Sequence, residues 1–246
     1  MRYIIFNILI LSFVSAQSLD SLFQVGNKFY ELEEYRKAVN IYENIEKQVI
    51  NEDLYLNLGN SYFKIGDLGN AIWSYEKAHS LSPRDKDIIY NLKFARTQVR
   101  DRIISPDSLA IIKFYQSIID KITILDIISI GGLLFLFSGI IFLMKYYIHI
   151  SLKLTSLINS STIICFLLVI WISIDKYWSL SDVSEAVIIT PAVDVRSSPI
   201  IKGENIVFRI HEGTKAKITI TQSVWCEVVL LDGKKGWILA KDIRLL

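Results

Sequence analysis

The residue types that most often carry catalysis are few and far apart in this chain of 246 residues. The three histidines, His79, His149 and His211, belong to three different regions of the sequence. Neither Cys165 nor Cys226 shares a motif with a histidine that could activate its thiol, and two such thiols cannot build a zinc site. The sequence also contains no paired catalytic carboxylates and no glycine-rich phosphate loop. These observations predict a protein that is not an enzyme and that uses no cofactor or metal ion.

The charge balance argues against nucleic acid as a partner. The chain has 27 basic and 25 acidic residues, and no run of lysine and arginine is dense enough to follow a phosphate backbone. Hydrophobic residues make up 52% of the chain, and much of this excess lies at the N-terminus and in two long apolar runs. The expected partners are therefore membrane lipid and other proteins.

Two uncharged apolar runs, residues 127–144 and 157–174, are the elements around which the chain is organised. Each run holds 18 residues, which as a helix measure about 27 Å, enough to cross the hydrocarbon core of a bilayer. The loop between them, residues 145–156, contains Lys145 and Lys153 and no acidic residue. The positive-inside rule places this loop in the cytoplasm. We therefore expect a transmembrane hairpin with both flanking regions outside the cytoplasm, rather than two buried helices of a soluble protein.

Residues 1–16 have the features of a secretory signal peptide. Arg2 is followed by a mostly apolar stretch, which ends in small residues at Ser15 and Ala16, where a signal peptidase would cut. An uncleaved anchor is the alternative. Export of the segment that follows agrees with the orientation taken from the loop lysines.

Residues 17–104 contain an internal repeat with a period of 33 residues. Aligning the chain with itself pairs the following residues: Gly26 with Gly59, Asn27 with Asn60, Ala38 with Ala71, and Tyr42 with Tyr75. This pattern resembles the tetratricopeptide repeat, in which small residues let two helices approach and aromatic residues fill the seam between them. The resemblance implies an all-α array of helix pairs.

A third unit begins at residue 86 and is incomplete. Lys93 stands where the first two units have glycine, and a lysine there would block a packed second helix. We therefore expect residues 86–102 to form a lone capping helix, with Lys93, Arg96 and Arg100 toward water. The predicted array is about five helices long, two repeats plus this cap.

The resemblance also suggests where a partner would bind. In tetratricopeptide arrays the concave face, lined by the first helix of each unit, holds an extended peptide or a partner's helix. The residues expected on this face are Asn27, Tyr30, Glu31, Asn57, Asn60, Phe63 and Lys64. An asparagine amide can bond a peptide backbone or a carboxylate, and Lys64 could pair with a negative charge. The alternative is that the asparagines cap helices or face solvent and that the aromatic residues serve packing.

Residues 105–126 predict an amphipathic linker helix. Ser105 is a suitable N-cap and Pro106 a suitable first residue of a helix. The apolar residues that follow recur at three- and four-residue spacing opposite a polar face. We expect this helix to lie in the membrane interface before the first span; docking on the repeat array is the alternative.

Residues 185–246 change to the period of β-strands after a linker at residues 175–184. Seven short, mostly alternating runs are separated by turn signals, among them Asp232-Gly233. The segments VDVRSSP, HEGTK, the W-x-E-V strand and DGKKGWI follow one another as in a bacterial SH3-like (SH3b) domain. This resemblance implies an all-β barrel. Trp225 and Trp237 stand in alternating strands, and we expect them in the barrel core rather than on a ligand-binding surface.

The order of these segments resembles one family across the full length, the tetratricopeptide component (BatE) of the Bacteroides-aerotolerance, or Bat, operons. The resemblance implies a scaffold in the bacterial inner (cytoplasmic) membrane with its folded domains in the periplasm. The implied partners are the von Willebrand A-domain Bat proteins, and the implied role is envelope stress tolerance, or aerotolerance.

The residues themselves leave two classes of function open. One is a scaffold for protein–protein interaction, with partners on the repeats and on the SH3-like domain. The other is a cell-wall protein, whose SH3-like domain binds or senses peptidoglycan while the repeats recruit a second protein.

Overall fold

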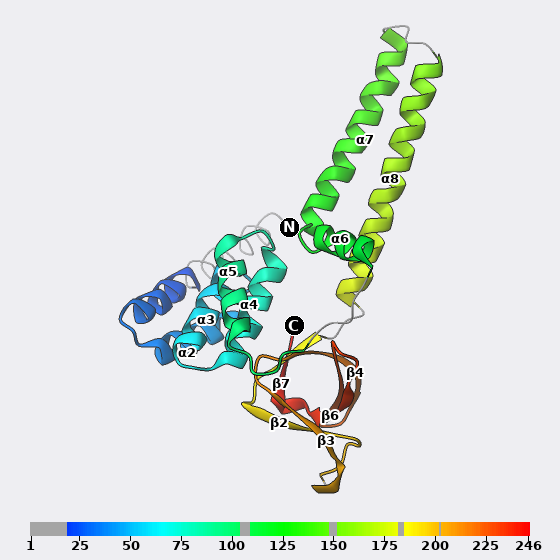
Figure 1. Cartoon of the computed structure of the whole chain (residues 1–246). Coiled ribbons are helices and arrows are strands. Elements are labelled where there is room, and N and C mark those ends of the chain that lie inside the picture. Colours follow the sequence, from blue (N-terminus) through cyan, green and yellow to red (C-terminus); the bar gives the residue numbers. More distant parts are fainter. Residues whose placement is uncertain (1–18, 104–108, 148–151, 182–184, 202) are drawn as a thin grey trace, which may run out of the picture. The chain divides into compact units, whose positions relative to one another are not determined.

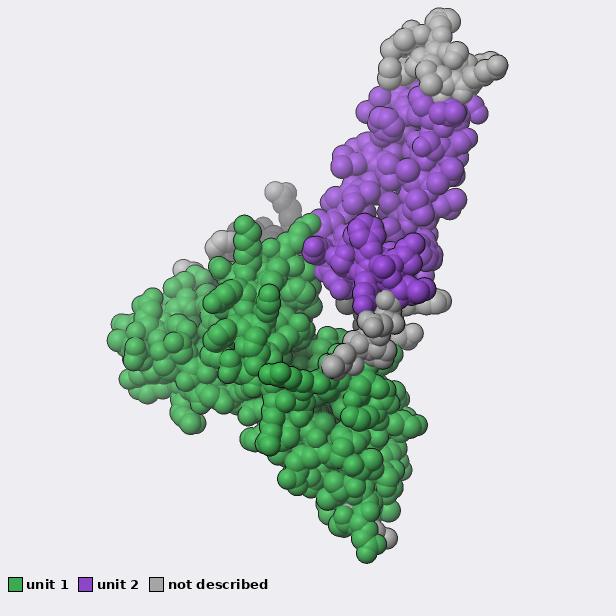
Figure 2. Space-filling view, in the orientation of Figure 1, with its two compact units in different colours: residues 1–106, 184–246 green, residues 107–183 purple. Residues whose placement is uncertain are grey.

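The computed structural model describes residues 19–103, 109–147, 152–181, 185–201 and 203–246. The chain divides into two compact units, drawn in green and purple in Figure 2. The first unit comprises Met1–Pro106 and Ser184–Leu246, and the second comprises Asp107–Val183. The predicted signal peptide lies outside the described residues. The two chain segments of the first unit are the predicted repeat and β regions, and the second unit contains both apolar runs.

Helices fill the N-terminal part of the first unit (Figure 1). Residues 19–31 are helical, and the helices that follow are α2 (Tyr35–Glu46), α3 (Glu52–Lys64), α4 (Leu68–Leu81) and α5 (Lys86–Thr97). The side chains of Asn51, Asp67 and Asp85 accept backbone N–H bonds at the starts of the last three helices. The described part of this array thus contains the five helices expected. The capping helix ends at Thr97, before residue 102.

Two glycines set the spacing of the helix pairs. A Cβ on Gly26 would lie 2.5 Å from the Tyr42 ring, and one on Gly59 would lie 2.6 Å from the Tyr75 ring. Each tyrosine ring packs directly on the glycine backbone of the preceding helix. A side chain at the glycine position would occupy the space that the ring fills. The expectation that small residues let the two helices of each unit approach, while Tyr42 and Tyr75 fill the seam between them, is confirmed.

The second unit holds two long helices that pack side by side (Figure 1), α7 (Ile124–Tyr147) and α8 (Leu152–Ser181). Both are long and apolar enough to span a membrane. Each exceeds the predicted run, since α7 begins at Ile124 rather than at residue 127 and α8 continues through most of the predicted linker. The early start of α7 has a local cause. Thr123 and Asp126 form a reciprocal cap, in which each side chain accepts the backbone N–H of the other.

The linker helix α6 (Ala110–Ile119) precedes α7 and is shorter than the predicted residues 105–126. The first backbone hydrogen bonds of α6 run from the N–H groups of Ile112 and Lys113 to the Leu109 carbonyl. The chain turns at residues 120–123 before α7. The predicted cap at Ser105 and Pro106 lies outside the described residues.

The C-terminal part of the first unit is a seven-stranded antiparallel sheet, here called the β module. Its strands are β1 (Glu185–Ile188), β2 (Ala192–Arg196), β3 (Ile206–His211), β4 (Lys215–Gln222), β5 (Trp225–Leu230), β6 (Lys235–Leu239) and β7 (Ile243–Leu245). The order across the sheet is β3-β2-β6-β5-β4-β1-β7. The seven predicted runs are therefore confirmed as strands. The sheet curves strongly in Figure 1, but β3 and β7 remain its edges, so it is not closed into the predicted barrel.

The expectation for the two tryptophans is wrong. Alternation along β5 and β6 buries Cys226, Val228 and Ile238 and leaves Trp225 and Trp237 half-buried on the other face. Side chains of a strand alternate between faces, so a tryptophan beside a buried isoleucine belongs to the opposite face. The core of the β module is made mostly of alanine, valine and isoleucine side chains instead.

Candidate functional site: the groove of the helical array and its junction with the β module

A hollow of about 320 Å³ lies on the helical array and is here called the groove. Four helices contribute to it, residues 19–31, α3, α4 and α5. Its lining residues are Tyr30, Asn60, Phe63, Lys64, Tyr75, Tyr90, Asn91 and Phe94. The groove therefore joins the two repeat units to the unfinished third one.

Aromatic rings form much of the groove wall. Tyr90 and Phe94 stack almost parallel, with ring centroids 6.4 Å apart, and Phe94 packs on Phe63 at 5.6 Å. Tyr90 is 68% exposed and Phe94 is 48% exposed. Large exposed rings beside one another are unusual on a surface that binds nothing, because they leave apolar area in water.

The asparagines of the repeat form a hydrogen-bond network that recurs once in each unit. In the first unit Asn27 Oδ1 accepts from the Tyr42 hydroxyl at 2.7 Å and from Asn57 Nδ2 at 3.0 Å. In the second unit Asn60 Oδ1 accepts from the Tyr75 hydroxyl at 2.8 Å and from Asn91 Nδ2 at 3.0 Å. Each network ties a helix to its partner and to the first helix of the next unit. We call these two networks the asparagine staples.

The staples determine which polar atoms of the asparagines can still form hydrogen bonds to a ligand. Burial raises the pKa of the Tyr42 and Tyr75 phenols, so both hydroxyls keep their protons and donate. Both lone-pair directions of Asn60 Oδ1 are then occupied. Within the described residues Asn60 Nδ2 makes no hydrogen bond, and its N–H groups can donate to a ligand in the groove.

The charge of the groove lining is positive. Lys64 is the cation, held with its Nζ 5.9 Å above the Tyr35 ring, and the described lining includes no carboxylate. A ligand that fits this surface offers oxygen acceptors or a negative charge, together with an apolar or aromatic side chain.

The seven residues expected at the groove divide into two groups. Tyr30, Asn60, Phe63 and Lys64 line it. Asn27 and Asn57 lie in the first staple, and exposed Glu31 is not among the lining residues. The alternative, in which the asparagines cap helices or face solvent, does not hold for Asn27 and Asn60, because both are half-buried and bonded to other helices of the array.

Sequence reasoning missed the contribution of α5. Tyr90, Asn91 and Phe94 line the groove, although the sequence predicts their helix only as a cap. A signal was present, since Asn91 lies 34 residues after Asn57 and two aromatic residues stand four apart on the same helix.

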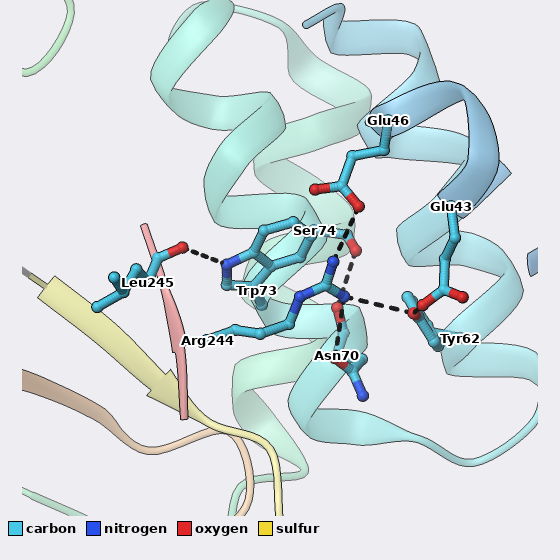
Figure 3. Close-up of polar contacts among 8 residues, drawn as sticks. All are labelled: Glu43, Glu46, Tyr62, Asn70, Trp73, Ser74, Arg244 and Leu245. Atoms are coloured by element: carbon cyan, nitrogen blue, oxygen red, sulfur yellow. Dashed lines mark hydrogen bonds and ion pairs between the residues drawn. The ribbon is translucent and has the colours of Figure 1, made fainter. Parts of the chain in front are cut away.

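A second region, here called the junction, joins the array to the β module (Figure 3). The Arg244 guanidinium of β7 lies 3.5 Å above the Trp73 ring, measured from Cζ to the ring centroid. It donates to Glu46 at 2.9 Å, to the Asn70 side chain at 3.2 Å and to the Tyr62 hydroxyl at 3.4 Å. Planar stacking together with several directed bonds is the geometry that arginine allows and lysine does not.

Backbone contacts extend the junction beyond this arginine. Trp73 Nε1 donates to the Leu245 carbonyl at 2.6 Å, as Figure 3 shows, and Trp73 itself is only 3% exposed. A Cβ on Gly69 of α4 would lie 2.7 Å from the Ile188 carbonyl oxygen of β1. Val187 of β1 is fully buried and belongs to the same core as the helices. The array and the β module therefore share a core.

A carboxylate completes the junction after α5. Asp101 accepts the backbone N–H of His211 at 2.6 Å, the Thr214 hydroxyl at 2.8 Å, and pairs with His211 Nδ1 at 2.8 Å. Partial burial acts to raise the pKa of the Asp101 carboxyl, but these hydrogen bonds outweigh it and hold that pKa below its usual value.

The β module has a smaller hollow of about 150 Å³. Half-buried Trp225 contributes to it, and the polar residues Asp194, Arg196 and Asp242 also line it. This hollow could hold a small polar ligand.

Within the described ranges, no cluster of three or more His, Cys, Asp or Glu side chains could hold a metal ion. Comparison of the chain with models of protein families gives no match, and comparison with curated proteins gives none either.

Proposed function

We propose that the protein is a non-enzymatic, membrane-anchored scaffold whose groove binds a peptide segment of a protein partner. The observation that carries this proposal is the combination of exposed Tyr90 and Phe94 with a cation at Lys64 and an amide donor on Asn60 that has no partner among the described residues. An apolar or aromatic side chain of the partner packs among the rings. Backbone or carboxylate oxygens of the partner accept bonds from Asn60 and Lys64.

In such a scaffold the helices of the first unit form a tetratricopeptide array, and the β module is an SH3-like domain. The 33-residue period, the glycine and tyrosine pairs and the recurring staples support the first assignment. The order of the strands and turn signals along the sequence supports the second. By its segment order the protein acts in a Bat-type complex of the bacterial inner membrane, with von Willebrand A-domain proteins as partners and envelope stress tolerance as the role.

Co-purification tests the groove. The double variant Tyr90→Ala/Phe94→Ala removes two exposed rings, so the array should stay folded while partners recovered with the full-length protein from membranes are lost. Ile89→Ala is the matched control, because Ile89 lies on the same helix, is also exposed and is not among the lining residues. Equal recovery of all partners by the double variant and by the control would contradict the proposal.

Reporter fusions test the membrane topology. The proposal places only the loop around Lys145–Lys153 in the cytoplasm and both folded regions in the periplasm. A reporter that is active only outside the cytoplasm should work after Leu246 and fail when it is inserted beside His149. Activity at His149 and none after Leu246 would reverse the orientation.

The second candidate function is binding or sensing of peptidoglycan by the β module. The hollow beside half-buried Trp225 favours it, since a partly exposed indole can pack on a sugar ring while nearby polar groups bond hydroxyls. The test uses the whole protein, because Val187 belongs to the core shared with the helices and a β fragment would lose that support. Sedimentation with insoluble peptidoglycan that Trp225→Ala abolishes would favour this candidate, and no sedimentation would exclude it.

A further inference from the structure

Helix α6 carries apolar side chains on two faces, and α8 covers one of them. On that face Ile119 is buried, and the Tyr115 ring packs on Trp171 of α8 with centroids 5.9 Å apart. Polar side chains of α6 and the turn that follows lie on another face and are exposed; they are Lys113, Gln116 and Asp120. An ordinary amphipathic helix has only two such faces, a covered apolar face and an exposed polar face.

A third face of α6 is apolar and open. Ile111, Phe114 and Ile118 are three and four residues apart, so they form one stripe along the helix. Ile111 is 74% exposed and Phe114 is 67% exposed. Successive residues of a helix are about 100° apart, which puts this stripe beside the α8-facing side and away from the polar face.

Two polar contacts fix where α6 sits along α8. The Tyr115 hydroxyl donates to Asp175 at 2.7 Å, and Lys176 Nζ donates to the Ile119 carbonyl at 3.1 Å. Burial and the neighbouring carboxylate raise the pKa of Tyr115 to about 12, so the phenol keeps its proton. Asp175 and Lys176 stand at the end of the apolar stretch of α8, which runs from Ser156 to Tyr177. Helix α6 is therefore tied to the level at which that stretch ends.

We propose that α6 lies in the membrane interface with Ile111, Phe114 and Ile118 inserted among the lipid acyl chains. The inference rests on the proposal that α7 and α8 span a bilayer. If they do, the ends of their apolar stretches mark the boundary of the hydrocarbon, and a helix bound there lies at that boundary. Its open stripe continues the lipid-facing surface of the two spans, and its polar face is turned to water.

The charges around α6 indicate whether its insertion depends on the charge of the lipid headgroups or on the apolar acyl chains. Lys113, Lys121 and Lys176 are balanced by Asp120, Asp126 and Asp175. Insertion therefore depends on apolar burial, and neither anionic lipid nor moderate salt should change it.

Fluorescence quenching in reconstituted vesicles tests the inference. Full-length protein with Cys165→Ala, and with Cys226 retained because it is buried, receives a single added cysteine that carries an environment-sensitive fluorophore. Phe114→Cys probes the open stripe, and Gln116→Cys is the matched control on the polar face. A label at Phe114→Cys should lose fluorescence with lipids that carry a quencher near the headgroup and keep it with aqueous iodide. The Gln116→Cys label should behave in the opposite way.

Each other outcome overturns the inference. Iodide quenching at both positions would place the stripe in water. Quenching by neither agent at Phe114→Cys would show that protein covers it, either the rest of the chain or a second copy. A label at Leu133→Cys, in the middle of α7, separates this failure from failure of the membrane proposal, since only a spanning hairpin exposes it to quenchers deep in the bilayer.

The two polar contacts can be tested with the same label. Tyr115→Phe keeps the ring beside Trp171 and removes the hydrogen bond to Asp175, so lipid quenching of the Phe114→Cys label should weaken. Unchanged quenching would show that the hydrogen bond does not position α6.

Discussion

The groove and the junction are built on the same helices, but the chain itself fills one and leaves the other open. At the junction Trp73 is covered by Arg244, and the guanidinium meets a carboxylate and two further acceptors. At the groove Tyr90 and Phe94 remain exposed, and Asn60 keeps a donor without a partner in the described residues. A surface that must hold an intramolecular partner has its charges paired. The surface with unpaired donors and exposed rings is the one suited to a ligand.

Gly59→Leu should have the largest effect, because it should unfold the helices on which both the groove and the junction are built. A side chain at this position meets the Tyr75 ring at once, and overpacking of a rigid core costs about 3 kcal/mol. Thermal unfolding followed by circular dichroism should show the loss. Gly132→Leu on α7 is the control, since a Cβ there meets nothing within 4 Å. A Gly59→Leu protein that melts like the wild type would mean that the seam is not tightly packed.

Arg244→Ala should affect the junction alone. Removing the guanidinium leaves the Glu46 carboxylate unpaired, and since both side chains are partly accessible we expect a cost of about 2 kcal/mol rather than that of a fully buried pair. Hydrogen exchange should become faster in β7 and α4, while recovery of groove partners is unchanged.

Arg244→Lys sharpens this test. Lysine keeps the charge but cannot stack and donate in several directions at once, so its exchange rates should lie between those of the wild type and Arg244→Ala. Loss of groove partners in Arg244→Ala without faster exchange at the junction would contradict the separation of the two faces.

Acid should loosen the junction through Asp101, with a smaller effect. The pKa of this carboxyl is lower in the folded protein than its ordinary value of 3.8. Its contribution to stability is therefore fully present above pH 3.8 and is lost as the pH falls through the lower, folded-state pKa. Hydrogen exchange of β3 and β4 amides against pH should show this acid limb, and Asp101→Asn should flatten it.

Asp194 provides the control for the pH dependence. Its pKa is also lowered, chiefly by its bond to Arg209, but this pair lies within the β module. Asp194→Asn should leave the acid limb of the junction in place. An acid limb that disappears in Asp194→Asn and persists in Asp101→Asn would show that the junction titrates elsewhere.

The features that the amino-acid sequence predicts well depend on short-range pattern. A run of 18 apolar residues, a 33-residue period and alternation in short strands each reflect how one element buries its own side chains. The two apolar helices, the five helices of the array and the seven strands can therefore be located from the order of residues alone. Boundaries are less accurate, since the cap between Thr123 and Asp126 extends α7 beyond the apolar run.

The features that the sequence does not predict depend on contacts between distant residues. Arg244 and Glu46 are far apart in the chain, and their own sequence contexts give no sign that they meet. The staples are visible as repeated asparagines, but the repeat pattern assigns their tyrosine partners to packing alone. Trp237 was misplaced because alternation fixes which residues share a face and does not say which face is the core.

Site-specific photocrosslinking in living cells tests the groove most directly. A photoreactive amino acid in place of Phe94 should form adducts with a partner protein, and those adducts should disappear when Asn60→Asp and Lys64→Ala are added. Asn60→Asp keeps an acceptor for Tyr75 and Asn91, removes the donor that faces the groove and adds a negative charge to the lining, so together with Lys64→Ala it should repel a ligand that offers oxygen acceptors or a negative charge. The same photoreactive group at Ile89 should form none of these adducts. Adducts that form equally from Ile89, or that survive Asn60→Asp/Lys64→Ala, would contradict the account.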